Sequence, residues 1–547
     1  MQVRTPGIRR AYRLRQWLAF AALPLAACAQ ASSQNTRTPS GGGGPANVAA
    51  SPRLIVAITV DQMRYDYLER FASQYQSGLA RLIKGGAIYT NAYQDHANTE
   101  TAPGHATVLS GREPYRTGIV LNAIGVPDAN APLIGGGGPG ASPFRFRGTA
   151  LIDWMKAKDR RSRALSVSRK DRGAILPIGR AKESVFWFAS NGNFTTSTYY
   201  SDTLPVWVKR FNARRIPQSY AGKAWEPLLP VSSYPEPDTV SVEDLGREPA
   251  FPHRLSDDTA RAVRDFIGFP WMDDLTVAFA LDGVNAMRLG SGPAPDLLAV
   301  SLSTTDAVGH RFGMASRELH DQMLRLDRAI GTLIDSLYKM RDSSTIVFSL
   351  TADHAVTLPP ELAKADPNQL PPMRVDLSDL AKTFRVAIAA RGADSDAFDF
   401  EDAMLFVDKA SLEKKGIKLD SLARAFADAA KREPGVYRAD LFQTILKADT
   451  TDPIVRRWRH AVPPEYPVLV VVTLNHGSVW GSYATGIHGS PWDDDGHVPL
   501  VLYGPTIAPG RHDEFEGVTS LAPTLARLIG ASPSAPIDGH VLTSAIR

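Results

Sequence analysis

LIVAITVD, at residues 54–61, is a short apolar run rich in β-branched residues that ends in an aspartate. Two later segments repeat this design and continue to an aspartate and a histidine. They are LLAVSL at 297–302, followed by Asp306 and His310, and TIVFSL at 345–350, followed by Asp353 and His354. Such runs are typical of buried parallel strands. Open α/β sheets bind ligands at the carboxyl ends of their strands, so we expect an α/β fold with a ligand site there.

The residues that follow these strands are of the types that bind Zn²⁺ in proteins, namely aspartate and histidine. Asp306 and His310 are four residues apart, so they share one face if a helix begins there. Asp353 and His354 are adjacent at a strand end. Asp306 alone could equally be a helix N-cap, a position that aspartate favours. The repetition of the pattern favours a metal site.

The segment NTETAPGH at 98–105 carries a second signal, a threonine hydroxyl beside Pro-Gly. A tight turn there could present Thr101 to a metal. The helical run ATVL at 106–109 would also place Thr101 near a helix N-terminus, which favours anions. The alternative is a turn and N-cap without a chemical role.

The first 27 residues have the features of a signal peptide. An apolar stretch at 17–27, too short to cross a bilayer, follows a segment with five arginines, and LAAC at 25–28 resembles a bacterial lipobox. Cys28 is the only cysteine, so we expect a lipid anchor at Cys28 and a periplasmic protein held at the outer membrane. Cleavage at an A-x-A site, giving a soluble periplasmic or secreted protein, is the alternative. Residues 28–51 resemble a flexible tether.

Composition excludes several classes of protein. Removal of the five arginines takes the formal net charge from +4 to −1, so we expect no nucleic-acid-binding surface. A single cysteine excludes disulfides within a monomer, the state we expect, so stability depends on the hydrophobic core. Gly135–Gly138 lacks the ending of a P-loop and is interpreted as a loop.

The pattern along the chain predicts a catalytic α/β core at 52–395 and 465–547, interrupted twice. An aromatic- and proline-rich stretch at about 185–255 is interpreted as an insertion over the active-site edge. A small α+β module is expected at 396–464, with a strand at 404–407, a helix at 419–431 and a strand from 435. Residues 467–473 are expected to return to the main sheet.

Five motifs together resemble one family. They are VDQ at 60–62, TETAPGH at 99–105, SRKDRGAI at 168–175, TADH at 351–354 and HGSPWD at 488–493. In this order they resemble the bacterial alkaline phosphatases with a threonine nucleophile, in the phosphodiesterase/nucleotide pyrophosphatase branch of the alkaline phosphatase superfamily. The resemblance covers most of the mature chain. It implies an alkaline-phosphatase-like core with a mostly parallel central sheet flanked by helices, plus inserted cap modules.

The resemblance also implies two Zn²⁺ ions and a reaction on small-molecule phosphate esters. One ion would be held by Asp306, His310 and His488, and the other by Asp61, Asp353 and His354, with Thr101 bridging toward it. Thr101 would accept the phosphoryl group, and a zinc-activated water would hydrolyse the phosphothreonine. The same His-Gly-Ser tripeptide begins at His476, but only His488 continues as the family motif does.

Lys170 and Arg172 bear on the choice of substrate. In an extended segment, residues two apart point the same way, and two cations there suit a dianionic phosphate. The flanking Arg169 and Asp171 equally suit a solvated charge cluster. In the family, Lys-x-Arg here accompanies monoesterase activity, and Asn122 matches the asparagine that donates to the same phosphoryl oxygens.

Three alternatives differ in chemistry. A sulfatase needs a Cys/Ser-x-Pro-x-Arg motif, which Thr101–His105 does not match. A phosphodiesterase or nucleotide pyrophosphatase is opposed by Lys170 and Arg172. A lipid-anchored protein that binds metal or phosphate without turnover has no need of Thr101. One departure from the family is Ala355-Val356 after the Asp-His motif, where relatives often have glycines.

Overall fold

The computed structural model describes residues 51–364, 370–481 and 484–547. The predicted signal peptide, Cys28 and all but the last residue of the tether lie outside the described residues. In the described part of the chain, no helix is long and apolar enough to cross a membrane.

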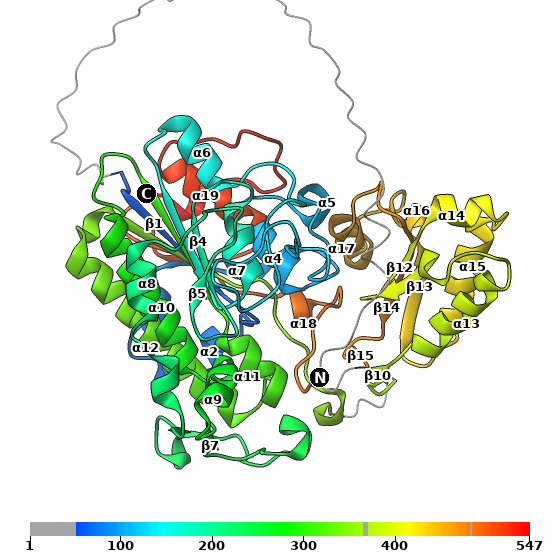
Figure 1. Cartoon of the computed structure of the whole chain (residues 1–547), viewed down its shortest axis with the longest axis horizontal. Coiled ribbons are helices and arrows are strands. Elements are labelled where there is room, and N and C mark those ends of the chain that lie inside the picture. Colours follow the sequence, from blue (N-terminus) through cyan, green and yellow to red (C-terminus); the bar gives the residue numbers. More distant parts are fainter. Residues whose placement is uncertain (1–50, 365–369, 482–483) are drawn as a thin grey trace, which may run out of the picture.

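A mostly parallel sheet forms the centre of the larger part of the molecule (Figure 1). Within the described residues it has nine strands, in the order β17-β2-β16-β9-β1-β8-β3-β4-β5. Their bounds are β1 Leu54–Val60, β2 Ala87–Tyr93, β3 Ala164–Ser168, β4 Ser184–Phe188, β5 Phe194–Thr195, β8 Asp296–Leu302, β9 Ile346–Thr351, β16 Leu500–Tyr503 and β17 Gly510–Gly517. The predicted α/β fold with a mostly parallel sheet is confirmed.

The three apolar runs are neighbours in this sheet. β1 pairs in parallel with both β8 and β9, so that Ile55 lies opposite Leu297 on one side and Val347 on the other. Every residue of the three strands is buried. Full burial explains why the runs are apolar throughout rather than alternating, since helices cover both faces. The predicted strands are therefore confirmed, and their carboxyl ends meet.

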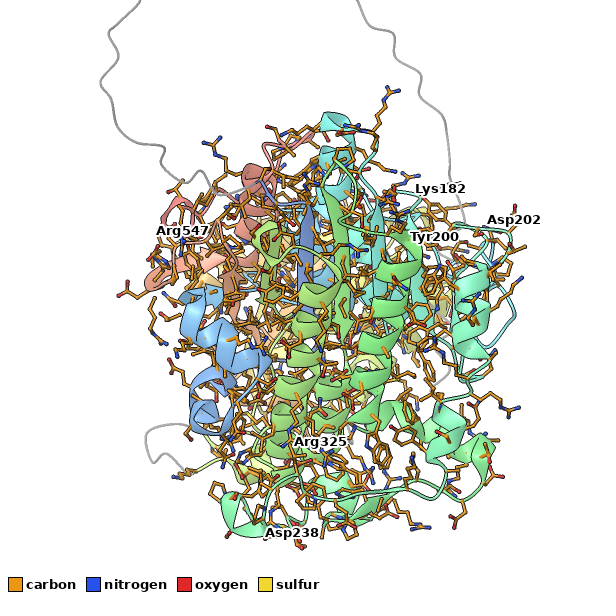
Figure 2. All side chains as sticks on the ribbon, turned by 90° about the vertical axis from the view of Figure 1, so that its left-hand side faces the viewer. Lys182, Tyr200, Asp202, Asp238, Arg325 and Arg547 are labelled. Carbon is orange, nitrogen blue, oxygen red and sulfur yellow. The ribbon has the colours of Figure 1, made fainter. Side chains whose placement is uncertain are left out.

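Helices form a layer on each side of the sheet. On one side α12 (Arg317–Met340) contacts α3 (Gly78–Gly85) and α10 (Trp271–Met287). Figure 2 looks onto this layer, with Arg325 marking α12. On the other side, α6 (Leu151–Lys158) packs against α19 (Leu521–Leu528). Other helices and strands of this part are α2 Tyr67–Arg70, α5 Pro114–Thr117, α8 Val206–Asn212, α9 Thr259–Asp265, β6 Ala224–Trp225 and β7 His253–Arg254.

The prediction that 185–255 is an insertion over the active-site edge is wrong for its first part. β4 and β5 extend the central sheet. The aromatic residues that suggested an insertion instead fill the core. For example, the ring centroid of Phe194 lies 3.9 Å from that of Phe279 on α10. Aromatic composition alone does not separate a core strand from a covering loop.

A smaller antiparallel sheet lies beside the core (Figure 1). Its order is β11-β12-β14-β13, with β11 Phe398–Glu401, β12 Met404–Val407, β13 Val436–Leu441 and β14 Val468–Leu474. Other elements of this region are α13 Ser378–Ala389, α14 Lys409–Lys414, α15 Leu419–Ala430, α16 Phe442–Ile445, α17 Pro453–Ala461, β10 Arg374–Val375 and β15 Val479–Trp480. The placement of 467–473 in the main sheet is wrong, because β14 pairs with β12 and β13. A buried apolar run shows that a strand is central, but it does not show which sheet it joins.

Helix α17 fastens this smaller sheet to the core. Trp458 of α17 is buried in a cluster with Val120 and Leu121 of the core and Val471 of β14. Next to this cluster, Arg456 donates to the Asp95 carboxylate at 2.8 Å. His460 Nδ1 donates to the Asp95 backbone carbonyl at 2.8 Å and lies 3.2 Å from the carboxylate. Burial opposes a charge on His460, but its hydrogen bond to Asp95 and the charge of Glu113 raise the pKa of His460 to about 9.

We expect this junction to stabilise the fold less in alkaline solution. Because the folded pKa of His460 lies above the ordinary value of 6.5, its contribution is fully present below about pH 6.5 and is lost as the pH rises through about 9. His460→Gln should therefore lower the free energy of unfolding in urea at about pH 6 and change it little at about pH 10. Equal losses at both pH values would contradict this.

Candidate metal and phosphate site

Three strand ends and one loop bring the predicted metal ligands together. Asp61 follows β1, and Asp353 with His354 follows β9. Helix α11 (Thr304–Phe312) begins after β8 and carries Asp306 and His310 on one face. The fourth contribution, His488, comes from the segment before α18 (Asp493–Gly496). The side chains of Asp61, Asp353 and His354 are completely buried.

Two groups of ligand atoms lie close enough together to hold metal ions. The atoms of Asp306, His310 and His488 lie within 4.8 Å of one another, and so do those of Asp61, Asp306 and His354. The first group is the predicted one. The second differs from the prediction, since Asp306 takes part in both groups and Asp353 stands beside them. Asp353 Oδ2 is 3.8 Å from His354 Nε2.

The three histidines are oriented as metal ligands usually are. Each Nδ1 donates to a backbone carbonyl: His310 to Gly486 at 2.6 Å, His354 to Ala355 at 2.9 Å and His488 to Thr99 at 2.7 Å. A carbonyl only accepts, so Nδ1 of each ring carries a proton, and Nε2 is the nitrogen left to face the cluster. Burial and the nearby His354 and His310 also hold the pKa of His488 well below its usual value, which keeps that ring neutral.

Unsatisfied buried atoms indicate that a cation belongs at this place. Among the described residues, four buried atoms of this cluster lack a hydrogen-bond partner and have only ion-pair contacts. They are His354 Nε2, Asp61 Oδ1, Asp61 Oδ2 and Asp353 Oδ2. Burial, with the charges of Asp306 and Asp353, raises the pKa of Asp61. Buried polar groups without partners are rare, and divalent cations satisfy oxygen and imidazole ligands of this kind. The residues present therefore fit a metal centre.

Gln62 links the two sides of the cluster, and sequence reasoning missed it. Its backbone N–H donates to Asp353 Oδ1 at 3.1 Å, and its side-chain amide donates to Asp306 Oδ1 at 3.2 Å. It adopts a left-handed conformation with φ of 65°. Non-glycine residues in this region are uncommon and cluster at functional sites. Its position in the VDQ motif was the only available signal.

Thr101 is the first residue of α4 (Thr101–Val108), so the prediction that it lies near a helix N-terminus is confirmed. Pro103 and Gly104 lie in the first turn of this helix rather than in a separate turn, because proline is tolerated there. The glycine permits a close approach, since a Cβ at Gly104 would lie 2.0 Å from the carbonyl oxygen of Asp353. The backbone of the Thr101 motif thus packs directly against the backbone of the Asp353 motif.

Lys170 reaches into the centre of the site. Its Nζ lies 3.0 Å from Thr101 Oγ1, 2.6 Å from Asp61 Oδ2 and 2.8 Å from Asp306 Oδ2. Burial opposes ionisation of Asp306, but the charges of Lys170 and His310 lower its pKa well below the usual value. Lys170 is therefore a buried cation in contact with the threonine hydroxyl.

The prediction of an extended segment from Lys170 to Arg172 is wrong. Lys170 is extended, but Asp171 begins the helix α7 (Asp171–Ile175), which contains Arg172. Arg172 contacts Asp171 Oδ1 at 3.5 Å. Burial raises the pKa of Glu100, which precedes Thr101, and the positive charge of Arg172 partly opposes that rise. The two cations thus come from a strand end and a helix start. An aspartate after a strand is a helix-start signal that outweighs the charge pattern.

Asn122 lies at the start of α4. Its side-chain oxygen accepts the N–H of Ala102 at 2.8 Å, and its own N–H donates to Glu100 at 2.7 Å. This fixes the amide so that its NH₂ group is the part able to donate to a ligand. The structure therefore brings Asn122, Lys170 and Arg172 to the surroundings of Thr101.

Comparisons with known proteins find relatives that align over most of this chain. The alkaline phosphatase PhoV of Synechococcus elongatus is 29% identical over 528 residues, which cover 91% of this chain and 94% of the relative. The alkaline phosphatase PafA of Elizabethkingia meningoseptica is 28% identical over 524 residues, covering 91% and 95%.

Solved structures show the same fold. The crystal structure of wild-type PafA matches with a TM-score of 0.84 and 28% identity, covering 92% of this chain and 100% of that one. Murine ectonucleotide pyrophosphatase/phosphodiesterase 5 has the fold at 14% identity, with a TM-score of 0.50 over 89% of this chain and 97% of that one.

The family resemblance expected from the five motifs is confirmed by a family model. The model of the type I phosphodiesterase/nucleotide pyrophosphatase family matches residues 55–433, which include the ends of β1, β8 and β9 and the Thr101 motif. The alkaline-phosphatase-like core is confirmed by the PafA structure. The chain belongs to the type I phosphodiesterase/nucleotide pyrophosphatase family, within the alkaline phosphatase superfamily.

Proposed function

We propose that the protein is an exported, zinc-dependent alkaline phosphatase that hydrolyses small phosphate monoesters through a phosphothreonine at Thr101. One observation carries the proposal: the Thr101 hydroxyl lies 3.0 Å from Lys170 Nζ, which also contacts Asp61 and Asp306 of the metal cluster. A nucleophile, a phosphate-binding cation and metal ligands thus share one site. The names of the relatives support the same activity.

Each group has a separate task in this proposal. Two Zn²⁺ ions would be held by Asp306, His310 and His488 and by Asp61, Asp353 and His354, and would lower the pKa of a coordinated hydroxyl. Thr101 Oγ forms the bond to phosphorus as the phosphorus–oxygen bond to the alcohol breaks in line, and the hydroxyl proton of Thr101 ends on the departing alcohol. Water then cleaves the phosphothreonine, which releases phosphate and restores the Thr101 hydroxyl. Lys170, Arg172 and the Asn122 amide hold the non-bridging oxygens. The N-terminus of α4 adds positive potential at Thr101.

Monoesters are preferred over diesters in this proposal because of charge. A bound monoester has two negative charges on its non-bridging oxygens, which match Lys170 and Arg172. A bound diester has only one negative charge, and its second ester group would lie against these cations without an ionic attraction to them. A phosphodiesterase of the same family is the alternative.

The rest of the proposal concerns location and assembly. We infer a monomer without a nucleic-acid-binding surface, anchored at the outer membrane through Cys28 after cleavage of the signal peptide. We also infer a core interrupted by a small module, which the pairing of β14 extends beyond 396–464.

Lys170→Ala should reduce kcat/KM for an aryl phosphate monoester by about a hundred-fold, as expected when a charged donor to the transition state is lost. The aryl phosphate diester should lose far less. Lys182→Ala, which removes a lysine that lies over Tyr199, is the control. Equal or greater diester activity in the wild type would sink the proposed monoesterase.

Thr101→Ala should abolish turnover but keep metal and phosphate binding, because the hydroxyl is the nucleophile and not the main ligand. Thr101→Ser should retain hydrolysis and form a phosphoserine that mass spectrometry detects after acid quenching. A wild type that binds phosphate but never hydrolyses an ester would favour the binding-protein alternative.

His488→Ala should lower the zinc content from two ions to one per chain, measured by plasma mass spectrometry, since Asp306 and His310 alone leave a three-residue group incomplete. His476→Ala is a matched control, because it alters the same tripeptide at an exposed residue that bonds Asp494. The hypothesis fails if both variants lose the same amount of metal.

A further inference from the structure

A row of buried side chains connects the segment that carries Lys170 with the strand end that carries Asp353. It consists of the Ser168 and Ser301 hydroxyls and the His105 ring. Ser168 ends β3 and Ser301 lies in β8, and the two residues are opposite one another in the parallel pairing of these strands. The Ser168 hydroxyl donates to Ser301 Oγ at 3.1 Å, and Ser301 Oγ lies 2.9 Å from His105 Nε2. Ser168, Ser301 and His105 are buried, with at most 2% exposure.

The ends of this row reach the two functional halves. At one end the backbone N–H of Lys170 donates to Ser168 Oγ at 3.0 Å. At the other end His105 Nδ1 lies 3.0 Å from Asp353 Oδ2 and 2.9 Å from the Thr101 carbonyl. The row therefore joins Lys170, the proposed phosphate-binding residue, to Asp353 and Thr101, the proposed metal ligand and nucleophile.

The hydrogen bonds of this row all run in one direction. His105 Nδ1 faces only acceptors, so it carries the proton and Nε2 accepts from the Ser301 hydroxyl. Ser301 then accepts from Ser168, and Ser168 accepts from the Lys170 amide. Each hydroxyl is both donor and acceptor, and such chains polarise and strengthen one another in a low-dielectric interior. Ser303 Oγ is 3.5 Å from both hydroxyls and competes only weakly.

A glycine keeps this row in place. A Cβ at Gly173 of α7 would lie 2.5 Å from Ser168 Oγ and 2.9 Å from Ser301 Oγ. The backbone of α7 therefore rests on the two hydroxyls, and Arg172 is its immediate neighbour. This explains why the SRKDRG segment contains a serine and a glycine whose roles the phosphate-binding residues do not account for.

We propose that Ser168, Ser301 and His105 are positioning residues that tie Lys170 to Asp353, so that the phosphate-binding cation and the metal half keep one fixed spacing. Ser168 fixes the backbone between β3 and α7 by a serine turn, from which the Lys170 side chain extends to Thr101. His105 fixes the Asp353 carboxylate. This inference rests on the proposed function for the role of Lys170.

The test measures activity and phosphate affinity in Ser168→Ala and Ser301→Ala. Each should lower kcat/KM for the aryl monoester by about ten-fold, as for a lost buried hydrogen bond, and leave the diester nearly unchanged. Each should also weaken binding of inorganic phosphate in calorimetry. The control is Ser166→Ala, also in β3, which removes a buried hydroxyl that bonds the Ala174 carbonyl at 2.6 Å outside the row.

Two further variants separate positioning from general damage. In a Lys170→Ala background, Ser168→Ala should have little additional effect, because its action passes through Lys170. Gly173→Ala should lower phosphate affinity in the same way as the serine variants. Equal effects of Ser166→Ala and Ser168→Ala, or additive effects with Lys170→Ala, would overturn the proposal.

The same measurements distinguish the two hypotheses. Lack of monoester preference in the wild type contradicts the proposed function. A loss of phosphate affinity in Ser168→Ala, suppressed by Lys170→Ala, supports the positioning row whatever the preferred ester. An unchanged phosphate affinity in Ser168→Ala, Ser301→Ala and Gly173→Ala contradicts the proposed positioning role.

Discussion

Mutual repulsion among three buried carboxylates is the constraint on which this site depends. Asp61, Asp306 and Asp353 lie at the ends of three adjacent strands, where burial disfavours their charges. Only cations and donors offset that repulsion. The protein supplies Lys170 from the neighbouring strand end and two bonds from Gln62. Divalent metal ions would satisfy the remaining oxygen atoms and imidazole nitrogens.

The sheet explains why these groups meet. β1 is central and pairs with both β8 and β9, so the loops after these strands leave the sheet side by side. The apolar cores of the strands fix the register, since slipping a strand by one residue would move its terminal aspartate away from the cluster. Packing of the hydrophobic core therefore determines the geometry of a polar site.

Sequence patterns predicted those parts of the molecule that follow from local chemistry. The three strands were predictable because a fully buried strand must be apolar, and the grouping of Asp306 with His310 followed from helical spacing. The sheet that β14 joins and the helical start after Lys170 were not predicted correctly. Both depend on tertiary pairing or on competition between local signals. Gln62 and His105 were missed as contacts because their roles appear only when distant segments meet.

The smaller sheet and the core are joined by charge as well as by packing. Asp95 accepts from arginines and a histidine of α17, beside a buried apolar cluster. The apolar contacts resist separation at any pH, whereas the histidine contributes only while protonated. The junction therefore combines an apolar contact that does not depend on pH with an ionic contact that does.

The close approach of Gly104 to Asp353 fixes the spacing between the start of α4 and the end of β9. The helix that begins with Thr101 and the strand end that carries Asp353 touch through backbone atoms, with no side chain between them. The spacing between these two stretches of backbone is thus set by direct peptide contact rather than by side-chain rotamers. A side chain at position 104 would therefore push the start of α4, and Thr101 with it, away from the strand end.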